Sequence, residues 1–409
     1  QLNLFIQKVE ASDFLAADKK NYLLGQAYAM RAYYYFHLLR TYGGVPIRLE
    51  PEVSNGNTDP VALRKERASE ADVLAAIKAD VNKSISLFGT AGALADKSQW
   101  NPSAALMLKG EVYLWSAKVY NTTADLAEAK SALNATAGTS LLPNFRDIFK
   151  NKNNGEIILA VRYRDGEAEM GTAYSYFLYS TFNFDNLHVK DSTTLGPTLV
   201  DPLNIASAPA QIIQRYAYTF ELFQSYNIAE TRRDATFYDY YKTSASGSDV
   251  IVTVRNTALV KFPGEMNAAN RRVFTDDWPV YREADRLLML AEITNAEGGD
   301  PSSYIQQIRD RAFANADPTP FVSGTQDANE LAIFEERSKE FVYEGKRWYD
   351  IRRMKYGGDP LVFISPSHPY GVLDKGTQAY KVLWPIETAI WTNDPLVDQT
   401  PGYASSKPK

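Results

Sequence analysis

The stretch that decides the fold is residues 25–46, which read GQAYAMRAYYYFHLLRTYGGVP. Apolar residues recur in it, and just before it, at the three- and four-residue spacing of one helix face. Gly43 and Gly44 end the pattern, and Val45-Pro46 favours an extended exit because the residue before proline avoids helical backbone angles. The stretch predicts a helix over residues 21–42, with a stripe formed by Leu24, Ala27, Tyr28, Arg31, Tyr34, Tyr35, Leu38 and Leu39.

Further helical patterns follow at residues 68–88, 101–120, 126–133 and 144–149. The third pattern from the N-terminus has a clear start, because an Asn101 side chain can cap free N–H groups and Pro102 suits the first helical position. Short Gly- or Pro-containing turns separate these helices, and small residues allow their neighbours to approach closely. Pairs of this kind resemble the tetratricopeptide repeat, whose period is about 34 residues. We therefore expect tetratricopeptide-like helix pairs over residues 1–151.

The character of the chain changes over residues 152–279. Residues 156–162 and 249–255 read as short strands, and long segments rich in Tyr, Phe, Asn, Ser and Thr lie between them. Long irregular segments in a compact fold are usually functional. Helical patterns return at residues 281–297, 300–314 and 327–356, and an irregular tail covers residues 383–403. The predicted fold class is thus mostly α, with a loop-rich region and short β-strands packed on a helical scaffold.

Composition narrows the classes of function. The chain has 409 residues, no cysteine, three histidines and a net charge of −5. These numbers exclude disulfides and cysteine-based sites, give no support to a metal site, and argue against nucleic acid, which selects a basic surface. Tyrosine is abundant, at 26 residues against 19 Phe and 6 Trp, and it suits surfaces that are half apolar and half hydrogen-bonding. We expect a binding protein with no catalytic residues, cofactor or metal.

Four motifs, in order along the chain, resemble the SusD/RagB family of outer-membrane nutrient-binding lipoproteins. They are residues 25–46; residues 282–292, which read READRLLMLAE; the set Glu336-Arg337, Glu340, Glu344-Gly345, Arg347-Trp348, Asp350 and Arg353; and the close of the chain at residues 384–386, 393–395 and 399–403. Gln26 departs from the family pattern, which usually has Glu there. The family's acylated cysteine is also absent, so we expect it upstream of Gln1 in a longer form of the protein.

The resemblance implies one SusD-like fold over residues 1–409, with a ligand-side region at 152–279 and C-terminal helix pairs and tail at 280–409. It further implies a lipoprotein at the surface of a Bacteroidetes-type outer membrane, within a polysaccharide-utilisation system. Such a protein captures an oligosaccharide and delivers it to a SusC-like TonB-dependent transporter, which the helical scaffold would contact. Two alternatives stay open: a RagB-like binder of peptides, and an α-helical glycoside hydrolase.

The glutamates of the third motif are the best case for catalysis, since glycosidases use a carboxylate pair. Glu336, Glu340 and Glu344, however, fall on one face of the expected helix, whereas glycosidase carboxylates flank the substrate from separate elements. We interpret them as structural, with i,i+3 ion pairs from Glu344 to Arg347 and from Asp350 to Arg353. Arg31 is expected to be buried against a carboxylate, and His37 to be a hydrogen-bonded residue between helices.

Aromatic residues outside the helices are the candidates for sugar stacking, because a sugar ring has an apolar face and a polar rim. Those within helices, such as Tyr28, Tyr34 and Tyr35, are assigned to the scaffold. The predicted stacking platforms are Trp278, Tyr240, Tyr241, Tyr238, Tyr179, Phe182 and Phe184, and the predicted polar partners are Asn183, Asp185, Asn186 and Asp277.

Overall fold

The computed structural model describes residues 1–89, 96–171, 187–189, 216, 218–246, 249–364 and 373–404. At residues 187–189, 238–246 and 249–256 it describes the backbone alone.

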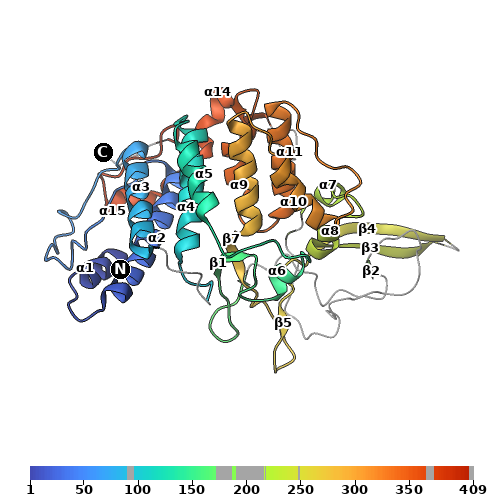
Figure 1. Cartoon of the computed structure of the whole chain (residues 1–409), viewed down its shortest axis with the longest axis horizontal. Coiled ribbons are helices and arrows are strands. Elements are labelled where there is room, and N and C mark those ends of the chain that lie inside the picture. The colour runs from blue at the N-terminus through green and yellow to red at the C-terminus, as the bar shows by residue number, and fades with distance from the viewer. Residues whose placement is uncertain are drawn as a thin grey trace.

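The N-terminal part is a row of helices in which each one packs on the next (Figure 1). They are α1 (Leu2–Glu10), α2 (Ala17–Tyr42), α3 (Glu70–Phe88), α4 (Pro102–Val119) and α5 (Asp125–Ala135), and the one-turn α6 (Asp147–Lys150) follows them in the chain. The predicted cap of α4 is confirmed, since the Asn101 side chain accepts a hydrogen bond from the N–H of Ala104 at 2.9 Å. Close packing of α4 on α5 requires Gly110, where a Cβ atom would come within 2.5 Å of the Leu133 side chain.

A second group of helices continues the row. α9 (Glu283–Ala296) packs on α4 and α5, and α10 (Ser302–Ala312) and α11 (Gln326–Glu340) pack on α9. The remaining helices are short: α7 (Phe220–Gln224), α8 (Thr231–Thr236), α12 (Arg347–Arg353), α13 (Leu361–Ile364), α14 (Lys375–Gln378), a 3₁₀ turn at Ala379–Val382, and α15 (Thr388–Asn393). The largest hydrophobic core lies between α2, α3, α4 and α9, around Phe36, Ile77 and Trp115. The mostly α, helix-pair fold class is therefore confirmed.

The strands form small antiparallel sheets beside the helices. β1 (Ile157–Val161) pairs with β7 (Trp278–Arg282), β2 (Leu187–Val189) pairs with β3 (Phe237–Ser246), and β3 also pairs with β4 (Asp249–Leu259). β5 (Glu265–Met266) pairs with β6 (Arg272–Val273), and β8 (Lys355–Tyr356) with β9 (Asp359–Pro360). In Figure 1 the β3–β4 ribbon extends from one end of the molecule, whereas β1 and β7 lie near the middle, below the helices.

Four expectations about elements need correction. The helix expected over residues 327–356 is interrupted between α11 and α12, where Tyr343 and Gly345 have φ values of 63° and 72° that a helix cannot contain. The helix expected from residue 281 starts at Glu283, because the two residues before it complete β7 against β1. β3 and β4 have 10 and 11 residues and are not short. The tail is not wholly irregular, since it contains α15.

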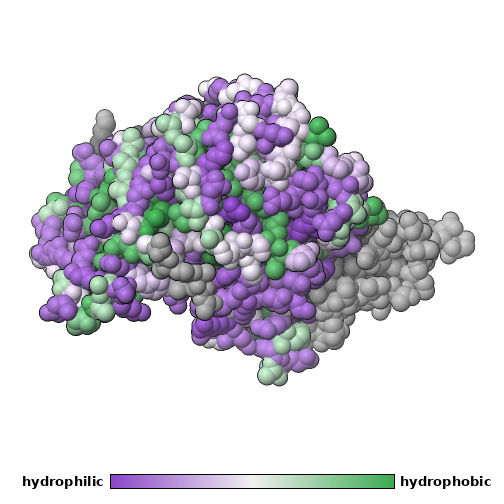
Figure 2. All heavy atoms as spheres, viewed as in Figure 1, coloured by the Kyte–Doolittle hydropathy of each residue, from purple (hydrophilic) through white to green (hydrophobic). Residues whose placement is uncertain are grey.

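Hydrophilic residues cover most of one face of the molecule (Figure 2). The hydrophobic residues on this face occur in separate small groups. Among the helices in the described ranges, none has the length and apolarity needed to cross a bilayer.

Candidate functional site

A pocket of about 480 Å³ opens where α2 passes the β1–β7 pair, and we call it the Trp278 pocket. Four aromatic side chains line it together with polar residues of the segment that follows β1. The lining residues are Met30, Tyr33, Tyr34, Ser98, Trp100, Leu159, Ala160, Val161, Arg162, Arg164, Glu167, Trp278 and Val280.

Three elements bring these residues together. Met30, Tyr33 and Tyr34 lie three and four positions apart on α2 and so share a face of that helix. Val161 pairs with Trp278 across the β1–β7 ladder, so the end of one strand and the start of the other meet at the pocket. A hydrogen bond of 3.0 Å from the Asn101 side chain to the Ile158 carbonyl ties the start of α4, and with it Trp100, to β1.

The turn between α11 and α12 holds the indole of Trp278 in place. Its Nε1–H donates a hydrogen bond of 3.0 Å to the carbonyl of Tyr343. A Cβ atom placed on Gly345 would lie only 3.5 Å from the indole, so the backbone turn between α11 and α12 packs directly against the ring. The ring is partly buried and belongs to two hydrophobic clusters at once. Trp278 is therefore a fixed platform rather than a freely rotating side chain.

The other aromatic residues differ in exposure. Trp100 is almost completely buried and packs on Tyr33, with ring centroids 5.5 Å apart. Burial raises the pKa of Tyr33, so its hydroxyl remains protonated and can donate a hydrogen bond. Tyr34 is 54% exposed, and its ring lies 6.2 Å from that of Tyr33. The pocket thus contains a buried aromatic base and an exposed aromatic edge.

Arg162 supplies a fixed cation at the pocket. Its guanidinium donates to both carboxylate oxygens of Asp277 at 3.0 and 2.9 Å, and to Asp96 at 2.8 Å. The hydrogen bonds to Asp277 raise the pKa of Arg162 against the opposing effect of burial. Hydrogen bonds from the Ser98 backbone and hydroxyl, and then the charge of Arg162, lower the pKa of Asp96. A second cation, Arg164, is more exposed and lies 3.5 Å from the carboxylate of Glu167.

The structure brings only part of the predicted site together. Trp278 lines the pocket, whereas Asp277 is 2% exposed and its carboxylate is already bonded to Arg162 and to the N–H of Asn153. Asp277 therefore contributes by orienting Arg162 rather than by facing the pocket. Tyr238, Tyr240 and Tyr241 are residues of β3, away from the Trp278 strand β7 in Figure 1, and their side chains are outside the description. Tyr179, Phe182, Asn183, Phe184, Asp185 and Asn186 all lie outside the described residues.

Sequence reasoning missed Tyr33, Tyr34, Trp100 and Arg162 as pocket residues. Tyr34, which was assigned to the scaffold, does lie on α2, but its ring is exposed and lines the pocket. Helical periodicity identifies a buried face only when a helix is covered on one side, and α2 packs on α1, α3 and α4 at once. The signal that could have found Trp100 is its position directly before the α4 cap, where a chain enters a helix from the surface.

The glutamates of the third motif belong to a buried ion cluster, which comprises Glu156, Arg232, Lys261, Arg282, Arg311, Glu336, Glu340 and Glu344. Glu340 bonds to Arg282 at 2.6 Å, to Arg232 at 3.1 Å and also to Arg311. Burial alone would raise the pKa of Glu340, but the charges of the three arginines outweigh it and lower that pKa. The ionised carboxylate of Glu340 has no proton to donate and is buried among three arginines, so the structural interpretation of this motif agrees with the geometry.

The individual ion pairs expected near this motif were partly correct. Asp350 and Arg353 form the predicted i,i+3 pair at 3.0 Å. Glu344 does not pair with Arg347, because the interruption after α11 turns it toward Arg282 and Lys261, at 2.8 and 2.5 Å. Arg31 is buried and binds Asp80 through two hydrogen bonds of 2.7 and 2.8 Å, and His37 contacts the Tyr349 hydroxyl at 3.2 Å, both as expected.

Comparison with known proteins places the chain in a family. The model of the SusD family matches residues 155–403, and a model described as starch-binding associating with outer membrane matches residues 1–114. A curated SusD-like protein of Formosa agariphila is 24% identical over 98% of this chain and 77% of its own length.

Solved structures also resemble this chain over nearly its whole length. A SusD superfamily protein from Bacteroides fragilis is 35% identical, with a TM-score of 0.87 over 98% of this chain and 84% of its own. NanU of B. fragilis is 30% identical, with a TM-score of 0.80 over 99% and 82%. A surface glycan-binding protein A from Bacteroides thetaiotaomicron, solved with laminarihexaose, is 17% identical with a TM-score of 0.67 over 98% and 83%, a likeness of fold. Together with the helical row and the motif glutamates, these matches show that the chain belongs to the SusD family.

Proposed function

We propose that the protein is a cell-surface glycan-binding protein whose oligosaccharide ligand occupies the Trp278 pocket. The observation that carries the proposal is the immobilised indole of Trp278 beside the exposed ring of Tyr34 and the fixed guanidinium of Arg162. Flat apolar rings bind the C–H face of a sugar, while a positioned donor binds its hydroxyl oxygens. Because Arg162 is held by two carboxylates, it donates from a fixed position and loses little entropy when a ligand binds.

The charge at the pocket further favours a neutral sugar. Arg162 and Arg164 are matched by Asp96, Asp277 and Glu167, so no net positive charge attracts an anionic ligand. The family match to starch-binding proteins, and the laminarihexaose bound by the B. thetaiotaomicron protein of the same fold, support neutral glucans as the first ligands to test.

Isothermal titration with laminarihexaose and with maltohexaose, followed by a glycan array, tests the proposal. Replacing Trp278 by Ala removes the platform, and we expect it to weaken binding by about 1–3 kcal/mol, the range for aromatic stacking on other ligands. Trp384→Ala is the matched control, because Trp384 is 58% exposed and lies outside the pocket. Equal affinity of the two variants would remove Trp278 from the site.

The two alternative functions, peptide binding and glycan hydrolysis, predict different experimental results. Tight binding of peptides at the Trp278 pocket, with no sugar bound, would support the RagB-like interpretation. New reducing ends after incubation with glycans, lost in Glu340→Gln, would support a hydrolase and would contradict the paired state of that carboxylate.

Delivery to a SusC-like TonB-dependent transporter and a lipid anchor on a preceding cysteine are parts of the same proposal. They rest on family membership alone. Co-purification of the transporter with the protein from outer membranes, and loss of the protein from intact cells on external protease treatment, would test the partner and the location in turn.

A further inference from the structure

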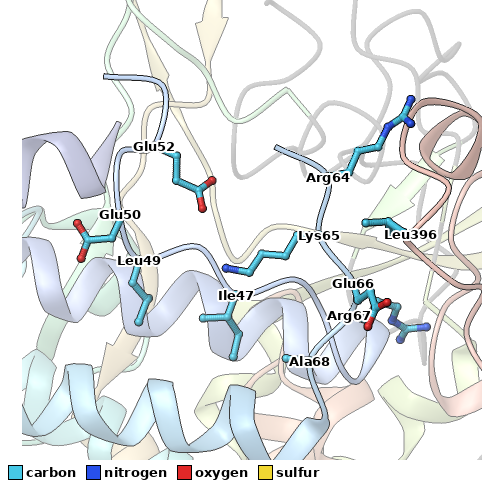
Figure 3. A pocket seen from close by; sticks show the side chains of 10 residues that line it. All are labelled: Ile47, Leu49, Glu50, Glu52, Arg64, Lys65, Glu66, Arg67, Ala68 and Leu396. Carbon is cyan, nitrogen blue, oxygen red and sulfur yellow. The ribbon is translucent and has the colours of Figure 1, made fainter. Parts of the chain in front are cut away.

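A second pocket, of about 660 Å³, lies between the irregular segments 47–52 and 64–68, and we call it the charged groove. Figure 3 shows the two segments on opposite sides of it, with Leu396 of the C-terminal tail at one edge. Its lining residues are Ile47, Leu49, Glu50, Glu52, Arg64, Lys65, Glu66, Arg67, Ala68 and Leu396, and none of them lines the Trp278 pocket.

Hydrogen bonds connect the two segments at both ends of the groove. At one end the Ala68 N–H donates to the Val45 carbonyl at 3.1 Å, and Arg67 binds the carbonyls of Gly44 and Tyr42 at 2.6 and 2.5 Å. At the other end the Arg48 guanidinium contacts both Glu52 and the Leu63 carbonyl.

The two segments are also held from behind. The Tyr35 hydroxyl bonds to the N–H and the carbonyl of Arg48 at 2.7 and 2.9 Å, and the Lys65 N–H donates to Asp394 of the tail at 3.2 Å. These hydrogen bonds fix the two segments on either side of the groove in position.

The chemistry of the charged groove differs from that of the Trp278 pocket. None of the described residues that line it is aromatic, so these residues offer a sugar no stacking platform. One wall carries Glu50 and Glu52, the opposite wall carries Arg64, Lys65 and Arg67 together with Glu66, and aliphatic residues complete the lining. In Figure 3 the Lys65 side chain extends from its own wall toward the middle of the groove.

Several of these groups are available to a ligand. The side chains of Glu50, Arg64, Lys65 and Glu66 form no hydrogen bond or ion pair with any other part of the chain that the structure describes. The backbone groups of Ile47 and Glu66 likewise have no hydrogen-bond partner among the described residues. Backbone N–H and carbonyl groups without an internal partner can form hydrogen bonds with the backbone of another chain.

We propose that the charged groove binds an extended segment of a partner protein. Successive side chains of an extended chain point to opposite sides, so a basic residue next to an acidic one places opposite charges toward the acidic and the basic wall. Aliphatic neighbours of that pair would contact Ile47, Leu49 and Leu396. An array of both signs selects one order of charges, which suits a specific protein segment better than a nutrient of variable sequence.

The test uses the whole chain with methyl-labelled Ile and Leu and three blocked peptides: Val-Lys-Glu-Val, Val-Lys-Lys-Val and Val-Glu-Glu-Val. We expect the mixed-charge peptide to shift the methyl signals of Ile47, Leu49 and Leu396, and to bind about fivefold more tightly than either like-charge peptide, as one favourable exposed ion pair allows. No shift at these methyl groups, or equal affinity of the three peptides, would overturn the proposal.

A charge-reversal variant of the groove provides a second test. In Lys65→Glu the basic wall loses its central cation, so the preference should move toward Val-Lys-Lys-Val. The matched control is Lys83→Glu, an exposed lysine on α3 outside the groove, which should leave the preference unchanged. An unchanged preference in Lys65→Glu would contradict the proposal. Laminarihexaose binding measured on the same variants reports on the Trp278 pocket, so failure at one site is distinguishable from failure at the other.

Discussion

Trp278 joins two parts of the molecule through a single side chain. It begins β7, and its indole reaches the turn between α11 and α12, where the Tyr343 carbonyl accepts its N–H. The next residue of that turn, Glu344, binds Arg282 at the other end of β7. One strand is thus attached to one turn at both of its ends, which explains how a partly exposed platform can be rigid.

Asp277 provides a prediction at the same scale. Its carboxylate is 2% exposed and forms two hydrogen bonds with Arg162, and bonds between charged groups each contribute about 1.5–3 kcal/mol. We expect Asp277→Asn to lower the free energy of unfolding by about 2 kcal/mol, because Arg162 keeps only Asp96 as a charged partner. Denaturant unfolding measures the change.

The contrasting variant for Asp277 is Glu167→Gln, in the exposed pair with Arg164. Exposed pairs are screened by water, so this change should cost less than about 0.5 kcal/mol. Equal losses in the two variants would show that burial does not strengthen the Asp277 pair.

Replacing Asp276, the neighbour of Asp277 in the sequence, should have the opposite effect and stabilise the folded protein. Burial raises the pKa of this carboxyl to about 6, so its ionised form is disfavoured in the folded state. Since the folded pKa lies above the ordinary value of 3.8, stability is lost as the pH rises from about 4 through 6. Asp276→Asn should therefore raise the free energy of unfolding at pH 7 by about 3 kcal/mol, because the pKa rises from 3.8 to about 6 and one pKa unit corresponds to about 1.4 kcal/mol.

The same substitution should have little effect at pH 3.5, where the native carboxyl is protonated in both states. The Asn side chain can still accept the hydrogen bond that Asp276 receives from the Gly264 N–H at 2.7 Å. Denaturant unfolding of both proteins from pH 3.5 to 7.5 checks this. A difference that does not grow with pH would contradict the raised pKa.

At the scale of elements, α11 shows how a charged helix can serve as core. Glu336 and Glu340 lie one turn apart on its buried face and meet Arg232 from α8, Arg282 from β7, Arg309 and Arg311 from α10. Desolvation of each ion opposes folding, and the closely paired opposite charges offset it. The cluster therefore ties α8, β7, α10 and α11 together through buried charges, beside the hydrophobic cluster that also joins α10 to α11.

Glu340→Gln tests this role of α11. Removing one charge of a buried pair leaves its partners uncompensated, at a cost of about 3–5 kcal/mol. Glu335→Gln, on the exposed face of the same helix, should change stability by less than about 0.5 kcal/mol.

The effect of Glu340→Gln should depend on pH. The Glu340 pKa is lowered in the folded state, so its stabilisation is present above about pH 4.3 and is lost as the pH falls toward the folded pKa. Urea unfolding at pH 7 and pH 3.5 should show a smaller difference between the variant and the native protein at the lower pH. A constant difference would contradict the lowered pKa.

At the scale of the whole molecule, the long helices α2 to α5 and α9 to α11 form one continuous row (Figure 1). The sheets made by β1 to β7 lie to one side of it, whereas β8 and β9 pack against α11, α12 and α13. The Trp278 pocket is at the boundary, with one wall from α2 and another from β1 and β7. A ligand that bridges these walls binds the folded state alone, so it must stabilise the whole chain.

We therefore expect the glycan identified by titration to stabilise the protein by about 2.7 kcal/mol at a free concentration one hundred times its Kd. Differential scanning calorimetry with and without ligand measures this as a rise in Tm. At the same ligand concentration the rise should be smaller in Trp278→Ala, by the binding free energy that this variant loses, and should be retained in full in Trp384→Ala. A rise of full size in Trp278→Ala would place the ligand elsewhere.

The sequence by itself determined the helices, the order of their pairs and the family. Apolar spacing, the Asn101 cap and the Gly43–Gly44 end are local signals, because a helix closes its hydrogen bonds within four residues. The motifs along the chain similarly identified the SusD family without any coordinates. Trp278 was recognised as a candidate because it is an aromatic residue outside the predicted helices, directly before the helical pattern returns, where a sugar ring could stack.

Only the tertiary structure decided which residues meet. Tyr33, Trp100, Arg162 and Trp278 come from four distant parts of the sequence, and nothing in the neighbourhood of any one of them predicts the other three. Glu344 likewise took Arg282 and Lys261 in place of Arg347, because the positive φ values at Tyr343 and Gly345 end the helix that would have kept Arg347 beside it. Periodicity reports which side of an element is buried, but the partner on that side is chosen by long-range packing, and the candidate site consists of such partners.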